Sequence, residues 1–160
     1  MTIKYASIVP LIGGMTLAGI KATGVKPSAI MTYSPFKNNE LSLKKYLPDV
    51  PYHVLDEDGD IDAGKDFDFI SALCPCAGLS LLSSGTQEVK ESANSWMFKT
   101  AEHVLGHLKP KVFWGENAPA LYALNNVAGT KVRQKLEDLA ERHGYTLTYY
   151  FTSTHLHGVP

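Results

Sequence analysis

The sequence contains few arginines, few cysteines and no long apolar run. Its 160 residues include 15 basic and 16 acidic side chains, and its arginines are Arg133 and Arg142. The net charge of -1 excludes a surface that is basic throughout, so any contact with nucleic acid is local or shared with another chain. Charged residues interrupt every apolar stretch before it reaches the roughly 20 residues of a membrane-spanning helix. We therefore expect no membrane partner.

The two cysteines, Cys74 and Cys76, are separated by a single residue. This spacing is too short for an ordinary disulfide, and two cysteines are too few for a secreted disulfide framework. The N-terminus also lacks the basic region, apolar stretch and cleavage site of a secretory signal. We therefore expect an intracellular protein with reduced thiols.

Short apolar stretches alternate with segments of helical period, which is typical of successive βα units. The sequence predicts six strands, at residues 5–10, 28–33, 53–55, 67–73, 111–115 and 145–154. It predicts helices between residues 14 and 24, and at 38–46, 95–108 and 130–143, the last one N-capped by Thr130 and ended by Gly144. The expected fold is α/β, with a doubly wound, mostly parallel sheet in a three-layer α/β/α arrangement.

Two of the predicted helices carry one apolar face each, at the spacing that a period of 3.6 residues requires. The faces consist of Met97, Ala101, Val104, Leu105 and Leu108 in one helix, and of Val132, Leu136, Leu139 and Ala140 in the other. We expect both faces in the core. His103 and His107 border the polar side of the first helix, where solvated histidines are expected.

Small, polar or thiol residues follow four of the predicted strands, where ligands bind in doubly wound sheets. These candidate site residues are Gly13-Gly14, Asp60, Cys74-Pro75-Cys76 and Glu116-Asn117. A cysteine on a turn at the end of a strand can be held as a thiolate and act as a nucleophile. A neighbouring carboxyl group can donate or accept a proton. This combination points to nucleophilic catalysis.

In order and spacing, these motifs resemble those of the cytosine-5 DNA methyltransferase family, from the first strand to Pro160. Ile12-Gly13-Gly14-Met15-Thr16-Leu17 resembles the glycine turn that holds the methionine part of S-adenosylmethionine, and Gly59-Asp60-Ile61 is similar to the adenine-binding turn. Pro75-Cys76-Ala77 resembles the catalytic Pro-Cys-Gln loop, and Glu116-Asn117-Ala118 the Glu-Asn-Val strand end. Residues 152–160 look like the approach to the family's Gln-x-Arg-x-Arg motif.

The resemblance implies a Rossmann-like methyltransferase that uses S-adenosylmethionine, releases S-adenosylhomocysteine and needs no metal. The implied cofactor-binding residues are Val9, Leu11, Ile12, Gly13, Gly14, Phe36, Asp60, Ile61 and Pro75. Val9 stands where the family has an aromatic residue, and Leu11 stands at its first glycine. No acidic residue follows the second strand to hold the ribose hydroxyls, and Phe36 is expected there to stack on adenine.

The resemblance also implies the catalytic residues Cys76, Glu116 and Asn117. Carbon 5 of cytosine becomes nucleophilic when the Cys76 thiolate attacks carbon 6 and Glu116 delivers a proton or a strong hydrogen bond at nitrogen 3. The carboxyl group must then carry or share a proton, which a partly closed pocket favours. The base must be flipped out of the duplex. Asn117 is expected to brace the cysteine loop, and residues 83–95 to form a mobile loop that closes over DNA.

Three other interpretations stay open from the sequence. The same residues would serve a tRNA cytosine-5 methyltransferase, and the departures at Leu11 and after the second strand would suit a non-catalytic relative that binds a cofactor or a partner. A metal site built from Cys74, Cys76 and the histidines is disfavoured, because the sequence has no second pair of cysteines to complete it.

The resemblance stops before the family's arginine-rich motif and target-recognition region. In methyltransferase sheets the strand that follows lies antiparallel between the fifth and sixth strands, so residues 145–154 have no obvious ladder partner. We therefore expect residues 1–160 to be a partial catalytic domain. The DNA-reading part would come from a second chain or a C-terminal region, in the cytoplasm of a prokaryote or of a phage-infected cell.

Overall fold

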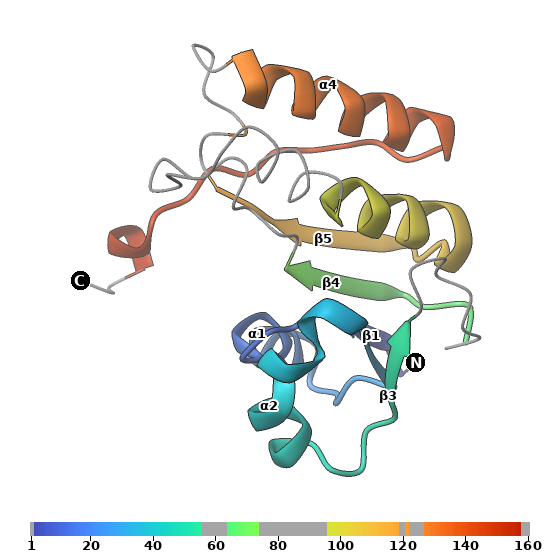
Figure 1. The fold of residues 1–160 in the computed structure, drawn as a ribbon, viewed down its shortest axis with the longest axis vertical. Helices are drawn as coiled ribbons and strands as arrows, with labels where there is room; N and C mark the ends of the chain where they lie inside the picture. The colour runs from blue at the N-terminus through green and yellow to red at the C-terminus, as the bar shows by residue number, and fades with distance from the viewer. Residues whose placement is uncertain (1, 56–63, 74–95, 119–120, 122–126, 158–160) are drawn as a thin grey trace.

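A computed structural model describes residues 2–55, 64–73, 96–118, 121 and 127–157 of the chain. These residues contain a five-stranded, fully parallel sheet in the order β3-β2-β1-β4-β5, with helices packed around it (Figure 1). The chain leaves β1 in one direction to build β2 and β3, and later returns to the other side of β1 to build β4 and β5. This is a doubly wound, Rossmann-like order, and it confirms the predicted fold class.

The strands agree with the sequence-based expectation, apart from their ends. They are β1 (Tyr5–Ile8), β2 (Ala29–Tyr33), β3 (Tyr52–Leu55), β4 (Phe69–Leu73) and β5 (Val112–Glu116). The helical elements are α1 (Gly14–Thr23), η1 (Ser34–Glu40), α2 (Leu41–Tyr46), α4 (Val127–Arg142) and η4 (Thr154–His157). Residues 96–102 are also α-helical and continue into the π-helical η2 (His103–Leu108); together they are called helix 96–108 below.

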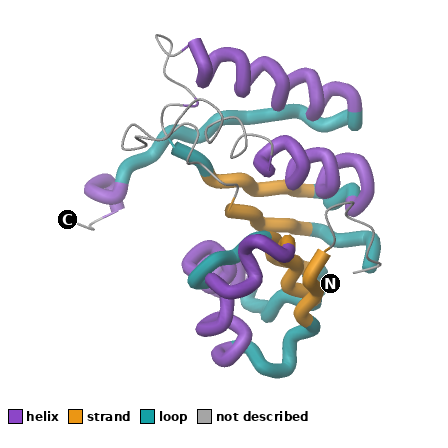
Figure 2. Tube along the Cα trace, viewed as in Figure 1, coloured by secondary structure: helices purple, strands orange, loops and turns teal. Residues whose placement is uncertain are grey.

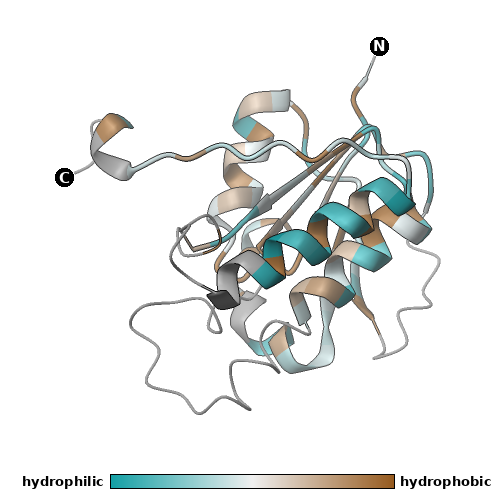
Figure 3. Cartoon of the chain, turned by 90° about the horizontal axis from the view of Figure 1, so that it is seen from above, coloured by the Kyte–Doolittle hydropathy of each residue, from teal (hydrophilic) through white to brown (hydrophobic). Residues whose placement is uncertain are grey.

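The two faces of the sheet pack against different layers, because successive side chains of a strand point to opposite sides. Ala6 and Ile8 of β1 belong to the larger core, which also contains the apolar faces predicted for helix 96–108 and α4. The other face of the sheet lies under α1, and a smaller cluster around Ile30 and Leu43 joins it to α2. Figure 3 shows that α4 turns hydrophilic residues outward. The predicted core faces of both helices are confirmed.

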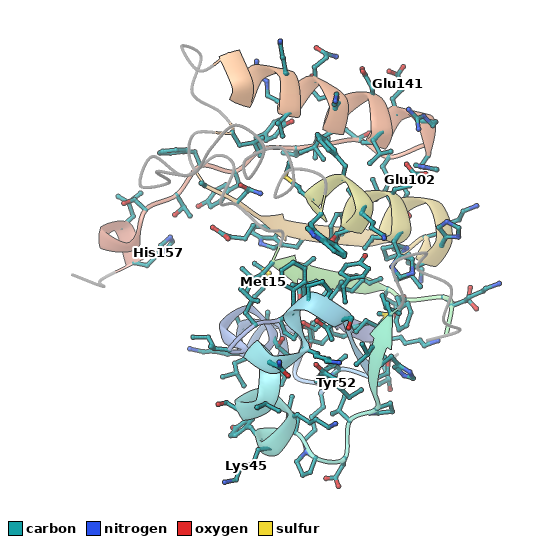
Figure 4. All side chains as sticks on the ribbon, in the orientation of Figure 1. Met15, Lys45, Tyr52, Glu102, Glu141 and His157 are labelled. Atoms are coloured by element: carbon teal, nitrogen blue, oxygen red, sulfur yellow. The ribbon has the colours of Figure 1, made fainter. Side chains whose placement is uncertain are left out.

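Helix 96–108 and α4 are also joined by polar contacts at one end. One carboxylate oxygen of Glu102 lies at hydrogen-bond distance, 2.8 Å, from His143 Nε2. The other carboxylate oxygen lies 3.8 Å from the Arg142 guanidinium. Figure 4 shows Glu102 on the side of its helix that faces the end of α4.

No helix among the described residues is both long enough and apolar enough to cross a membrane.

The expectation that His103 is solvated is wrong. His103 is 6% exposed and its ring packs 6.5 Å from that of Tyr33, whereas His107 is exposed as expected. The prediction assumed an α-helical period through Leu108, but the helix widens to a π-helical turn whose last N–H, from Lys109, is donated to Val104 five residues earlier. A π-helical turn changes which residues share a face.

The predicted sixth strand is also wrong. Residues 145–153 form no strand in the structure, and Figure 2 shows this stretch as a loop that runs past the end of the sheet. Tyr145 anchors its start, with its hydroxyl donating to Pro110 O at 2.7 Å. β-rich composition alone does not make a strand, because a strand needs a neighbour with which to form a hydrogen-bonded ladder.

Several element boundaries differ from the prediction, and three of them change how an element begins. α4 begins at Val127, before the predicted cap Thr130. The predicted helix 38–46 starts earlier, as the 3-10 helix η1, in which Pro35 occupies one of the first two positions where its missing N–H costs nothing. β4 starts at Phe69 rather than Phe67, and Phe67 is nevertheless buried.

An electrostatic clamp holds the beginnings of β1, β4 and β5 together. The Asp68 carboxylate accepts the Lys4 backbone N–H at 2.8 Å and the Lys111 ammonium at 2.6 Å. The Asp68 N–H in turn donates to Lys4 O at 2.9 Å. The hydrogen bond from Lys111, followed by that from Lys4, holds the pKa of Asp68 below its usual value of 3.8.

We expect this clamp to stabilise the fold at neutral pH and to be lost in acid. A carboxylate with a depressed folded-state pKa stabilises the fold above its unfolded pKa, and this contribution disappears as the pH falls through the folded value. Asp68→Asn should therefore lower Tm at pH 7, and the difference from the unsubstituted chain should shrink below about pH 3.8. Thermal unfolding followed by circular dichroism measures both. The exposed Asp49→Asn is the control, and an equal Tm loss at both pH values for Asp68→Asn would contradict the expectation.

Candidate functional site

All five strands of the described sheet end at the same edge, because they are parallel. The residues that follow these ends are therefore neighbours in the same order as the strands. Along the edge, the predicted adenine-binding residues follow β3 and β2, the glycine turn follows β1, the cysteine loop follows β4, and Glu116 ends β5. Asp60, Ile61, Pro75 and Cys76 themselves lie outside the described residues, which stop before them at Leu55 and Leu73.

The turn after β1 has the backbone of a glycine turn, even where it lacks glycine. Val9, Leu11 and Gly13 all have positive φ angles, of 46°, 51° and 99°. Left-handed backbone costs a residue with a side chain about 1–2 kcal/mol. Leu11 thus adopts the conformation that glycine would favour, at the position where the family pattern has its first glycine. The turn geometry persists despite this departure.

Gly13 and Gly14 play different structural roles. A Cβ at Gly13 would lie 2.7 Å from Leu43 Cδ1 of α2, and its φ of 99° is unfavourable for other residues. A Cβ at Gly14, the first residue of α1, would meet nothing within 4 Å. No side chain caps the N-terminus of α1. Its N–H groups and the open space at Gly14 therefore suit the close approach of a ligand with an anionic group.

The two glycines offer a matched pair of substitutions. Gly13→Ala should lower the free energy of unfolding by about 1–2 kcal/mol, because alanine must adopt a left-handed conformation against buried Leu43. Gly14→Ala should leave stability unchanged or raise it by up to about 1 kcal/mol, because alanine favours helix. Urea unfolding measures both values. Equal stabilities for the two variants would show that the turn is not held in this conformation.

Phe36 follows β2 and forms an aromatic corner with Trp96. Its ring meets the Trp96 indole edge-on at 5.3 Å, and Tyr33 packs on the same indole at 5.0 Å. Phe36 is therefore present at the predicted place, partly buried against the core. Trp96 was not predicted as a site residue. Its contacts with Tyr33 and Phe36 place an aromatic wall beside the end of β2.

Glu116 stands beside the point where the cysteine loop begins. In the β4–β5 register, Glu116 is the partner of Leu73, the last described residue before that loop. Its side chain is exposed. Asn117 turns inward: its Nδ2 lies 3.1 Å from the Met97 sulfur, and its Oδ1 accepts the Ala118 N–H at 2.8 Å. Asn117 thus braces the helix that follows the cysteine loop.

A largely apolar groove of about 360 Å³ opens next to Glu116 and Asn117. One wall is β5, and the others are helix 96–108, α4 and the extended residues 147–151. Its aromatic lining includes Phe113, Trp114, Tyr149, Tyr150 and Phe151. The groove lies between β5 and residues 147–151, which do not pair with the sheet.

The metal interpretation gains no support from the described part of the chain, where no three His, Cys, Asp or Glu side chains gather at one place. Cys74 and Cys76 lie outside this part.

Comparison with known protein families gives an independent result. Residues 7–160, which are nearly the entire chain, match the family of C-5 cytosine-specific DNA methylases. No curated protein is similar enough in sequence to count as a relative. The matched range includes the glycine turn and Glu116.

Proposed function

Because the chain belongs to the C-5 cytosine-specific DNA methylase family, we propose that it transfers a methyl group from S-adenosylmethionine to carbon 5 of a flipped-out cytosine in DNA. In this proposal Cys76 forms the covalent adduct at carbon 6, and Glu116 acts at nitrogen 3. The order of the strand ends carries the proposal. A DNA substrate also agrees with the predicted intracellular location.

The strand order matches the order in which the reacting groups must meet. Neighbouring strands lie about 4.8 Å apart, and β4 lies between β1 and β5. A methyl donor held by the turn after β1 would therefore meet the chain that leaves β4, in which the proposal has Cys76 as nucleophile. A base bound to that cysteine meets Glu116 on the following strand. Any other position of β4 in the sheet would separate the nucleophile from one of its two partners.

The described residues fit S-adenosylmethionine. The open space at Gly14 and the uncapped start of α1 suit the carboxylate of its methionine part. Phe36 and Trp96 offer aromatic surface for a purine one strand away, after β2. When bound, this molecule supplies an electrophilic methyl group on a sulfonium. Asp60, Ile61 and Pro75 are proposed to complete its site, together with Val9, Leu11 and Ile12 of the turn.

The protein groups then act in sequence. The Cys76 thiolate forms a bond to carbon 6 while Glu116 supplies a proton or hydrogen bond at nitrogen 3, and the ring electrons move to carbon 5. Carbon 5 takes the methyl group, a base removes its proton, and re-formation of the ring double bond expels the thiolate. Asn117, the neighbour of Glu116, contacts the Met97 sulfur of helix 96–108, and this contact holds the end of β5 against that helix.

Trapping the adduct tests this chemistry directly. With S-adenosylmethionine and DNA that contains 5-fluorocytosine, the chain together with the segment proposed below to complete the domain should form a stable covalent complex, because carbon 5 then carries fluorine in place of the proton that elimination must remove. Cys76→Ser should abolish the complex, and Glu116→Gln should slow its formation by about 10²–10⁴-fold. Gel mobility and mass spectrometry measure the product.

The substrate arms of this experiment separate the competing functions. A complex with 5-fluorocytosine tRNA and none with DNA would make the protein an RNA methyltransferase. Binding of S-adenosylhomocysteine without any adduct on either nucleic acid, even when the completing segment is present, would favour the non-catalytic interpretation.

We also propose that residues 1–160 are a partial catalytic domain and that another polypeptide segment completes the sheet beside β5. Within the described residues β5 is an edge strand, and its Val112 and Trp114 side chains are half exposed. Across the groove, Tyr150 and Phe151 are about two-thirds exposed or more. Unpaired strand edges with apolar side chains favour the addition of a strand. A segment paired there would bring the DNA-reading part next to Glu116.

The chain alone should therefore bind the cofactor but not methylate DNA. Calorimetry with S-adenosylhomocysteine and transfer of a labelled methyl group to DNA measure the two properties on the purified 160-residue chain. Multiple turnovers by this chain alone would show that no further segment is needed for catalysis.

A further inference from the structure

Four hydroxyl groups meet in a buried space between α1 and the sheet. The Tyr5 hydroxyl lies 2.7 Å from Ser71 Oγ, and Ser7 Oγ lies 2.7 Å from Thr16 Oγ1. A weaker contact of 3.5 Å, from Ser71 to Ser7, joins the two pairs. All four residues are at most 1% exposed. Because buried hydroxyls are costly unless they are hydrogen-bonded, their number here suggests a role beyond filling space.

The register of the sheet brings these groups together. Ser7 and Ser71 are direct partners in the β1–β4 pair, so their side chains stand side by side on the face beneath α1. The helix approaches this face very closely. A Cβ at Gly19 of α1 would clash with the Tyr5 hydroxyl. Thr16 and Gly19 are the buried residues of α1, so hydrogen bonds and close backbone approach seat this helix, rather than a large apolar face.

The network stays intact over the range of physiological pH. Burial raises the pKa of the Tyr5 phenol above its usual value of 10.0, although the hydrogen bonds with Ser71, Ser7 and Thr16 act in the opposite direction. The phenol therefore keeps its proton and can donate it to a neighbour.

Two of the four residues lie close in the sequence to the two motifs that are proposed to act together. Thr16 is in the first turn of α1, two residues after Gly14. Ser71 lies two residues before the end of β4, where the cysteine loop begins. The hydroxyl groups thus connect the helix that carries the glycine turn with the strand that leads to Cys76.

We propose that Thr16 and Ser71, linked through Ser7 and Tyr5, are positioning residues that fix the glycine turn relative to the end of β4. This inference rests on the proposed function, since it concerns how the cofactor turn is aligned with the nucleophile. None of the four residues touches the reactants. An apolar side chain at position 16 would fill similar space, but it would let the helix slide along the sheet, because apolar contacts are not directional.

Substitutions of Thr16 test the proposal in the full chain. Thr16→Val keeps the shape and removes the hydroxyl, whereas Thr16→Ser keeps the hydroxyl. Thr16→Val should weaken S-adenosylhomocysteine binding about tenfold. The affinity of Thr16→Ser should stay within about twofold of that of the unsubstituted chain. Calorimetry measures affinity, and hydrogen exchange of residues 9–17 reports whether the turn loosens. Thr23→Val is the matched control, because it removes a hydroxyl that bonds Gly19 O at the other end of α1.

A double-substitution cycle asks whether the hydroxyls act as a unit. Thr16→Val and Ser71→Ala should each weaken binding, and together they should cost less than the product of their separate effects. Tyr5→Phe, which keeps the ring packed on Phe69, replaces Thr16→Val if that variant does not fold, and it should weaken binding in the same direction.

Three results would overturn the proposal. These are unchanged affinity in folded Thr16→Val and Tyr5→Phe, equal weakening by Thr16→Ser, or equal weakening by Thr23→Val, which would indicate a general effect on helix stability. Failure of the unsubstituted chain to bind S-adenosylhomocysteine is a distinct outcome, because it would refute the cofactor proposal itself and this inference with it.

Discussion

The pairing of β1 with β4 is the constraint on which the site depends. The two strands are more than 60 residues apart in the sequence, yet they lie side by side from Tyr5 and Phe69 to Ile8 and Ala72. The Asp68 clamp fixes the start of this pair through Lys4 and Lys111. With the register set at one end, the glycine turn after β1 and the chain that follows Leu73 of β4 must leave the sheet beside each other at the other end. A shift by one residue would also turn Ser7 and Ser71 to opposite faces.

The two faces of the sheet stabilise the molecule in different ways. The face toward helix 96–108 and α4 is apolar, and its burial supplies most of the hydrophobic stabilisation. The face under α1 carries hydroxyls and admits the helix only because position 19 is glycine. Apolar packing tolerates small shifts of a helix, whereas hydrogen bonds at 2.7 Å do not. The rigid contact lies under α1, the helix that follows the glycine turn, and the adaptable contact lies on the opposite face of the sheet.

The sequence predicts those parts of the fold that depend on local periodicity. The alternation of apolar strands and amphipathic helices yields the parallel sheet and the buried faces of helix 96–108 and α4. The failures concern information that is not local. Residues 145–153 have strand-like composition but no neighbouring strand, and His103 is buried because the helix widens in its last turns. The hydroxyl network could be suspected only from Ser7 and Ser71 within otherwise apolar strands. Of the predicted site, the structure places the glycine turn, Phe36 and Glu116 along one edge. The roles of these residues, like those of Cys76 and Asp60, stay predictions.

The turn after β1 shows why a residue pattern is a weaker criterion than the geometry behind it. Leu11 departs from the family motif, yet its backbone is left-handed. Local preference opposes this conformation, so the surroundings must impose it. The Val9 N–H donates to Met31 O at 2.8 Å, Gly13 is packed against Leu43, and Thr16 is held by Ser7. These contacts fix the chain on both sides of Leu11, which leaves it little alternative. A motif residue can therefore change while its conformation remains, provided that the flanking contacts exceed the roughly 1–2 kcal/mol of strain.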